Sequence, residues 1–298
     1  MTTSLPLDPG AGLAERLVRL PDGRRIRTVV AGEGDGPLVV FEAGMSAPAG
    51  CWVHTQREIS RHARTLSYDR AGYGGSDVDP APRTLERIVD DLTAVLDAVG
   101  ESDSVVLVGH SWGGPVLRVF ADRHPSRVAG LVFVDASLHE TMPPKNAALA
   151  RRSFAVMALL ARIGGAALIR KVSLPHGPSP AISPADVDIM WRDYACVRAM
   201  KAGGREAEQI LPALPTMRRL QDKGTPPVPT VCVQAGRVDR GMKTLRPLFN
   251  ATAAQLMAAV PQGRVVVVEG AGHLVPQEQP DAVHEAILAV LAAARVAP

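Results

Sequence analysis

Residues 105–114 read Val-Val-Leu-Val-Gly-His-Ser-Trp-Gly-Gly. Four apolar residues, typical of a buried β-strand, run directly into the pattern Gly-x-Ser-x-Gly around Ser111, and an apolar helical pattern continues from Val116 to Phe120. A serine on such a sharp strand–turn–helix connection needs glycines beside it, because side chains there would clash. The turn projects the hydroxyl group at a helix N-terminus, where free N–H groups stabilise a developing oxyanion. We therefore predict that Ser111 is a nucleophile.

A serine nucleophile needs a base, and the position of His273 favours it over the seven other histidines. His273 stands in the sequence Gly-Ala-Gly-His-Leu at 270–274, just after an apolar run at 265–268. A loop in that place holds an imidazole at the carboxyl edge of a sheet. His110 is next to Ser111 in sequence, but on this turn its side chain is expected to point elsewhere.

The acid that orients the base is expected in a loop after another strand. Asp239 follows a strand pattern at 230–235 through Gly236, and we predict that its carboxylate holds the tautomer of His273. Asp135, directly after the strand pattern at 131–134, is the alternative acid. We expect Asp135 to be structural, at the junction with the following segment.

Two backbone N–H groups are expected to form the oxyanion hole. One is that of Trp112, the residue after the nucleophile. The other belongs to the loop 42–46, Glu-Ala-Gly-Met-Ser, where we assign Met45 as the donor and Gly44 as the next choice.

The rest of the chain predicts a doubly wound α/β fold with a mostly parallel sheet. Helical patterns at 85–99 and 283–291 show apolar residues three and four apart. No strand leads into a Gly-x-Gly-x-x-Gly phosphate turn, which argues against a dinucleotide-binding domain. Strand patterns are the hairpin 15–20 and 24–31, a weaker strand at 65–68, and continuous apolar runs at 38–41, 105–108, 131–134, 231–233 and 265–268.

Strand and helix alternate everywhere except between residues 138 and 225. This segment is helical in pattern and carries 13 basic against 7 acidic residues, a local charge of +6. We predict a helical cap at 138–225, inserted into a core domain formed by 1–137 and 226–298.

Composition narrows the range of functions. The chain has 298 residues and a net charge of +3, with scattered basic residues, so a nucleic-acid partner is not expected. No apolar run reaches the roughly 20 residues of a membrane span, and the first 20 residues lack the apolar core of a signal peptide, so we expect a cytoplasmic protein. Three separated cysteines suggest no disulfide framework, and no metal or organic cofactor site is visible. The oligomeric state cannot be read from the sequence.

With these residues in place, the chain resembles the α/β-hydrolase fold superfamily, in particular its capped, esterase-like branch. The likeness covers nearly the full length, in the order serine, aspartate, histidine. The stretch 68–76 also looks like a loop of that branch with a structural role, so that Asp69 and Arg70 are not site candidates. Many relatives carry His-Gly where this chain has Glu42-Ala43-Gly44. The resemblance implies acyl transfer through an acyl-enzyme on Ser111.

The resemblance implies a small-molecule substrate, a carboxylic ester or lactone with an apolar group. Two alternatives stay open: the same triad acting on an amide or C–C bond or in perhydrolysis, and a binding protein without catalysis. An aspartate in place of the serine would favour an alkyl-enzyme route for epoxides or halides, which the serine disfavours. The candidates for the pocket lining, which can equally be packing residues of the cap, are Met157, Leu160, Trp191 and Tyr194, with Met142, Phe154 and Met190.

Overall fold

The computed structural model describes residues 12–138, 144–239 and 242–296, and the side chains from residue 147 onward in the second range. Eight strands form one sheet in the order β1-β2-β4-β3-β5-β6-β7-β8. All neighbours from β4 to β8 are parallel, whereas β2 runs antiparallel to β1 and β4. The strands are β1 (Leu13–Arg19), β2 (Arg25–Ala31), β3 (Val39–Glu42), β4 (Thr65–Tyr68), β5 (Val105–His110), β6 (Val128–Val134), β7 (Thr230–Ala235) and β8 (Arg264–Val268).

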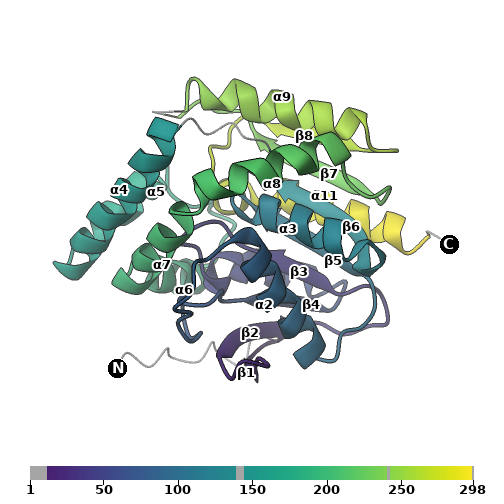
Figure 1. Ribbon diagram of the computed structural model, residues 1–298, viewed down its shortest axis with the longest axis horizontal. Helices are drawn as coiled ribbons and strands as arrows, with labels where there is room; N and C mark the ends of the chain where they lie inside the picture. The colour runs from purple at the N-terminus through teal and green to yellow at the C-terminus, as the bar shows by residue number, and fades with distance from the viewer. Residues whose placement is uncertain (1–11, 139–143, 240–241, 297–298) are drawn as a thin grey trace.

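Helices cover both faces of this sheet. One apolar core joins the sheet to α2, α3, α8 and α9, and a second joins the opposite face to α1 and α11 (Figure 1). The helices are α1 (Val53–Ile59), α2 (Leu85–Ala98), α3 (Gly113–Arg123), α4 (Pro144–Arg162), α5 (Ala166–Ser173), α6 (Pro184–Tyr194), α7 (Val197–Ala207), α8 (Ile210–Lys223), α9 (Leu245–Ala258), α10 (Val275–Glu278) and α11 (Pro280–Ala294), with short 3₁₀ turns η2 (Ala49–Trp52) and η3 (Pro125–Arg127).

The doubly wound α/β fold predicted from the sequence is confirmed. Each predicted strand is present, and the two helical patterns correspond to α2 and α11. The expectation that every continuous apolar run is buried on both faces is wrong for β8, where Val266 and Val267 are exposed. The reason is that β8 is the last strand of the sheet and has a neighbour on only one side.

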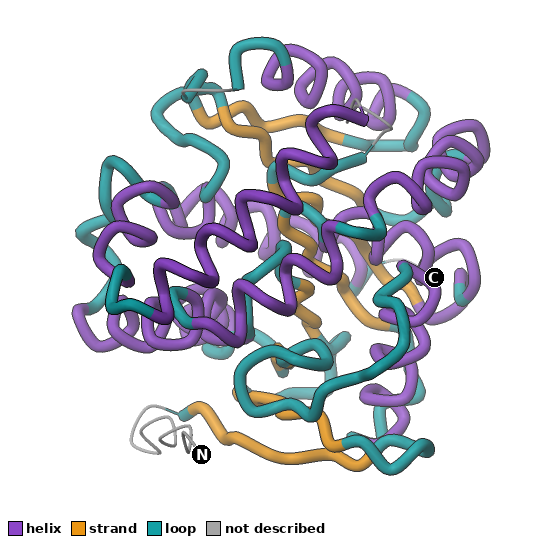
Figure 2. Tube along the Cα trace, turned by 60° about the vertical axis from the view of Figure 1, so that its left-hand side comes forward, coloured by secondary structure: helices purple, strands orange, loops and turns teal. Residues whose placement is uncertain are grey.

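The helices α4 to α8 all lie between β6 and β7 in the chain, inside the range 138–225 where the sequence predicts an insertion. In Figures 1 and 2 the helices α4 to α7 stand together at one end of the sheet, while α8 runs alongside α3. This arrangement leaves the loops after β3, β5 and β6 facing the inserted helices. Among the described residues, no helix has the length and apolar character needed to cross a membrane.

Candidate active site

The turn after β5 holds Ser111 in a strained backbone conformation. Its φ is 52°, in the left-handed region that residues with a side chain rarely occupy. A Cβ on Gly109 would lie 2.8 Å from the Leu117 side chain, and one on Gly113 would lie 2.5 Å from the carbonyl oxygen of Glu42. The prediction that both glycines of the motif are needed for steric reasons is therefore confirmed.

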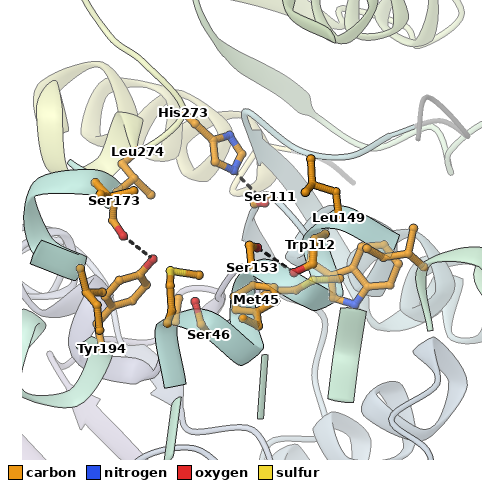
Figure 3. Close-up of a pocket in the computed structure, with 18 of the residues that line it drawn as sticks. Met45, Ser46, Ser111, Trp112, Leu149, Ser153, Ser173, Tyr194, His273 and Leu274 are labelled. Atoms are coloured by element: carbon orange, nitrogen blue, oxygen red, sulfur yellow. Dashed lines mark hydrogen bonds between the residues drawn. The ribbon is translucent and has the colours of Figure 1, made fainter. Parts of the chain in front are cut away.

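Three side chains from distant parts of the chain meet at this turn. Nε2 of His273 lies 2.9 Å from Oγ of Ser111, as Figure 3 shows. Nδ1 of the same ring lies 2.6 Å from Oδ2 of Asp135. A carboxylate can only accept a hydrogen bond, so Nδ1 carries a proton and Nε2 of the neutral ring is free to accept the serine proton. Ser111, His273 and Asp135 thus form a continuous chain of hydrogen bonds, in which the proton of Ser111 can pass to His273.

The carboxylate that contacts His273 is that of Asp135, so the expectation that Asp239 makes this contact is corrected. Asp239 instead pairs with Arg237, whose Nε lies 2.7 Å from its Oδ1. The sheet order explains the difference: β6, which precedes Asp135, lies directly beside β5, whereas β7, which precedes Asp239, lies one strand further from Ser111. Both aspartates follow a strand at the same edge, and only their distance from β5 separates them.

Asp135 is fully buried and held from several sides. Its carboxylate accepts two hydrogen bonds from Arg246 of α9, one of them 2.9 Å long, and a third from the backbone N–H of Ala235 at 3.2 Å. Burial alone would raise the pKa of Asp135, but the hydrogen bonds from His273 and Arg246 and the positive charge of Arg246 outweigh it and hold the pKa well below its usual range. The acid is therefore ionised and fixed in position.

His110 also belongs to the site, although its side chain was expected to point away. Its Nε2 lies 2.8 Å from the backbone oxygen of His273, and the two rings lie 4.9 Å apart. A carbonyl oxygen accepts, so Nε2 of His110 is the donor. Burial, together with the charge of His273, lowers the pKa of His110 to about 3. A neutral His110 thus fixes the loop that carries His273 without adding charge.

The loop after β3 runs close to the nucleophile. A Cβ on Gly44 would lie 3.1 Å from Cβ of Ser111. The N–H of Ser46 donates to the hydroxyl oxygen of Tyr73 at 3.1 Å. In the described part of the chain, no such partner is found for the N–H groups of Met45 and Trp112, the two predicted oxyanion donors. Both residues line the same cavity as Ser111.

Arg70 fixes the backbone of this loop, although the stretch 68–76 is not expected from sequence to belong to the site. The Arg70 guanidinium donates to the carbonyl oxygens of Ala43 at 2.5 Å and Gly44 at 2.7 Å. It also pairs with Glu42 at 2.5 Å and with Glu206 of α7 at 2.6 Å. Burial raises the pKa of Glu42 more than the charge of Arg70 lowers it. A sequence signal for this role existed, since Glu42 and Arg70 have opposite charges at the ends of the neighbouring strands β3 and β4.

A cavity of about 730 Å³ opens above Ser111, between the sheet edge and the inserted helices. The predicted lining residues Met157, Leu160 and Tyr194 are part of its wall. Trp191 does not line this cavity: it is buried against Tyr194 and beneath the guanidinium of Arg170, and it lines a smaller cavity beside it. Phe154 is a further lining residue, Met190 lines a smaller neighbouring cavity, and Met142 lies outside the described residues.

Most of the cavity wall is apolar, with a few hydroxyl groups on it. The Tyr194 hydroxyl donates to Ser173 Oγ at 3.1 Å on one side of the cavity (Figure 3). Within the described ranges, no group of three or more His, Cys, Asp or Glu side chains is placed to hold a metal ion. The apolar wall can therefore hold an apolar molecule beside Ser111.

Comparison with known proteins agrees with this fold. Residues 39–286 match the alpha/beta hydrolase family. The chain is 32% identical over 131 residues to Epoxide hydrolase 4 of Mus musculus, which covers 43% of the chain and 36% of that protein. It is 38% identical over 118 residues to Epoxide hydrolase B of Mycobacterium tuberculosis, which covers 38% of the chain and 33% of that protein. The matches thus span only about a third of the length of these curated relatives.

Among solved structures, the fold is similar to that of Cfl2 from Burkholderia cenocepacia. The TM-score is 0.75 at 22% sequence identity, and the alignment covers 97% of this chain and 99% of the other. Identity at this level shows a shared fold and does not extend to substrate.

Proposed function

This chain belongs to the alpha/beta hydrolase family, and we propose that it hydrolyses a carboxylic ester or lactone with an apolar group through an acyl-enzyme on Ser111. One observation carries the proposal: Ser111 Oγ, His273 and Asp135 are joined by contacts of 2.9 Å and 2.6 Å at the floor of a largely apolar cavity. Such a chain of contacts activates a serine hydroxyl for attack on a carbonyl carbon.

In the proposed reaction, Ser111 Oγ forms a bond to the carbonyl carbon while Nε2 of His273 takes its proton. The carbonyl oxygen becomes an oxyanion, which the free N–H groups of Met45 and Trp112 stabilise. The leaving alcohol receives the proton from His273, which leaves an acyl group on Ser111. Water then attacks the acyl carbon with His273 as base, so that the acid is released and the serine is restored.

The relatives named epoxide hydrolases raise an alternative that the nucleophile disfavours. A serine oxygen that opened an epoxide would form an alkyl ether. An ether has no carbonyl carbon for water to attack, so the enzyme would not turn over. Attack on an ester or lactone leaves an acyl-serine, which water can hydrolyse, and the proposal therefore keeps to acyl substrates.

The test is covalent labelling with a fluorophosphonate, followed by mass mapping and by assays with p-nitrophenyl esters. We expect a single adduct on Ser111, none in Ser111→Ala, and greatly slowed labelling in His273→Ala. Ester turnover in these variants is expected to fall by roughly 10⁴-fold or more.

Two controls make this test specific. An aryl epoxide and peptide anilides are offered at the same concentrations, and turnover of either above that of every ester would contradict the proposed bond type. Tight binding of ester analogues without labelling or turnover would instead indicate a binding protein on this fold.

A further inference from the structure

The outer face of α4 and α5 exposes an unusual number of large aliphatic side chains. Six of the fourteen that are exposed in the described chain lie between residues 149 and 172, and each is 49% to 71% exposed. Those on α4, with Ile163 directly after its end, recur at intervals of seven, three and four residues, so they continue along one side of the helix. Such patches on a folded protein mark sites of interaction. The six residues are Leu149, Val156, Leu159, Ile163, Leu168 and Val172.

The same two helices are cationic. Residues 141–185 contain no aspartate or glutamate but six lysines and arginines. Five of the cations are exposed on α4 and α5, and in the described chain none of them forms an ion pair. These five are Arg151, Arg152, Arg162, Arg170 and Lys171.

Exposed aliphatic side chains, with exposed cations on the same two helices, match the surface of an anionic lipid bilayer. They do not match a second copy of this chain, because a two-fold interface would bring the cations of one face against those of the other. Figure 1 shows α4 and α5 side by side at the edge of the molecule, away from the sheet. This position leaves the face accessible to a flat surface.

This face also surrounds the entrance to the cavity above Ser111. Leu149 and Val156 of α4, with Leu168 and Val172 of α5, line that cavity and are exposed to solvent at the same time. We propose that the α4–α5 face docks on an anionic phospholipid surface and that apolar substrate enters the cavity from it. Entry of substrate rests on the proposed function, whereas docking does not.

Docking is tested with Ser111→Ala protein, which separates binding from hydrolysis. Sedimentation is compared for vesicles of phosphatidylcholine alone and for vesicles with one third phosphatidylglycerol. We expect strong, salt-sensitive binding only to the second. Removing Arg151, Arg162 and Lys171 together by substitution with Gln is expected to weaken it on the order of 100-fold, at about fivefold for each charge.

Two further variants define the face. Leu159→Ser with Ile163→Ser is expected to weaken vesicle binding, while the same pair in the active protein leaves hydrolysis of a soluble ester unchanged, because neither side chain lines the cavity. The matched control removes three exposed arginines from the edge strands, Arg16→Gln, Arg19→Gln and Arg264→Gln, and is expected to keep its binding.

Three outcomes would overturn the proposal. One is the absence of binding to the anionic vesicles by a protein whose circular dichroism shows that it is folded. Another is an equal loss of binding in the control and the α4–α5 charge variant. The last is a stable dimer in light scattering that Leu159→Ser with Ile163→Ser converts to a monomer, which would assign the face to a second copy of the chain.

Discussion

At the scale of single residues, two aspartates at one sheet edge have different surroundings. Asp135 is buried and contacts His273, whereas Asp239 is about a quarter exposed and contacts Arg237. We predict that Asp135→Asn lowers kcat for an ester by roughly 10⁴-fold, because an amide at this position no longer holds the required tautomer of His273. Asp239→Asn is the matched control and is expected to change kcat by no more than a few fold. Steady-state kinetics of the two variants decide the point, and the reverse order of damage would restore Asp239 as the acid.

Arg246 supports this acid and has a predicted effect on stability. Arg246→Met leaves the buried carboxylate of Asp135 without its cation, so the free energy of unfolding is expected to fall by about 3 kcal/mol. In an Asp135→Asn background, Arg246→Met is expected to lower the free energy of unfolding by less, because no buried charge is then left unpaired. Urea denaturation of the four proteins gives the coupling energy. Additive effects, with no coupling, would mean that Arg246 acts only through packing.

Of the residues around Ser111, some could be predicted from the sequence and others could not. Ser111 and His273 each stand in a local motif that marks a position at the sheet edge, and the structure brings them together. The choice between Asp135 and Asp239 depends on the order of the strands, which no local pattern contains. Arg246 lies 111 residues from Asp135, in a helix that carries no local sign of this contact.

At the scale of elements, the loop after β3 depends on a buried ion-pair network. Arg70 holds the carbonyl groups of Ala43 and Gly44, and through Glu206 it connects this loop to α7. We predict that Arg70→Lys lowers kcat by about tenfold or more, because the three donors of an ammonium group cannot replace the five hydrogen bonds of the guanidinium, and the N–H of Met45 then moves from its place.

The control for this prediction must separate geometry from unfolding. Kinetics are measured where urea denaturation shows the variant to be fully folded, and KM is expected to change less than kcat. Glu206→Gln keeps Arg70 in place and is expected to have a smaller effect. A loss of activity that only follows the fraction unfolded would show that Arg70 has a purely structural role.

The strands and the helices α2 and α11 were predicted from sequence because each carries its own local pattern. The order of the strands, the exposure of β8 and the position of Arg70 were not, because they depend on contacts between segments far apart in the chain. Glu42 illustrates the difference: the sequence shows that it replaces the His-Gly of many relatives, and only the fold shows that it pairs with Arg70.

At the scale of the whole molecule, the inserted helices and the sheet are joined by buried charges as well as by apolar contacts. Arg57 of α1 lies 2.9 Å from Asp186, near the start of α6. Burial acts to raise the pKa of Asp186, but the nearby His54 ring and the hydrogen bond and charge of Arg57 outweigh it and lower the pKa to about 2. The stability that this carboxylate contributes is present above about pH 4 and is lost as the pH falls toward its folded pKa.

A buried histidine lowers the stability of the molecule in a higher pH range than Asp186 does. His284 of α11 is largely buried beside the ring of His54 at 5.4 Å, and its Nε2 has no hydrogen-bond partner among the described residues. Burial, with the charge of His54, lowers the pKa of His284 to about 4. Because the unfolded chain binds a proton near pH 6.5 and the folded chain does not, stability is lost as the pH falls from there.

We therefore predict that the free energy of unfolding falls less steeply in acid for His284→Phe than for the wild type. Between about pH 7.5 and about pH 4.5 the wild type is expected to lose about 2 kcal/mol more of its free energy of unfolding than the variant. This is the linkage contribution of one histidine whose pKa is lowered to this extent. His110, whose pKa is about 3, stays in the variant and keeps part of the dependence. Urea denaturation at both pH values measures the difference, and parallel pH profiles for the two proteins would show that His284 takes up a proton in the folded state as readily as in the unfolded one.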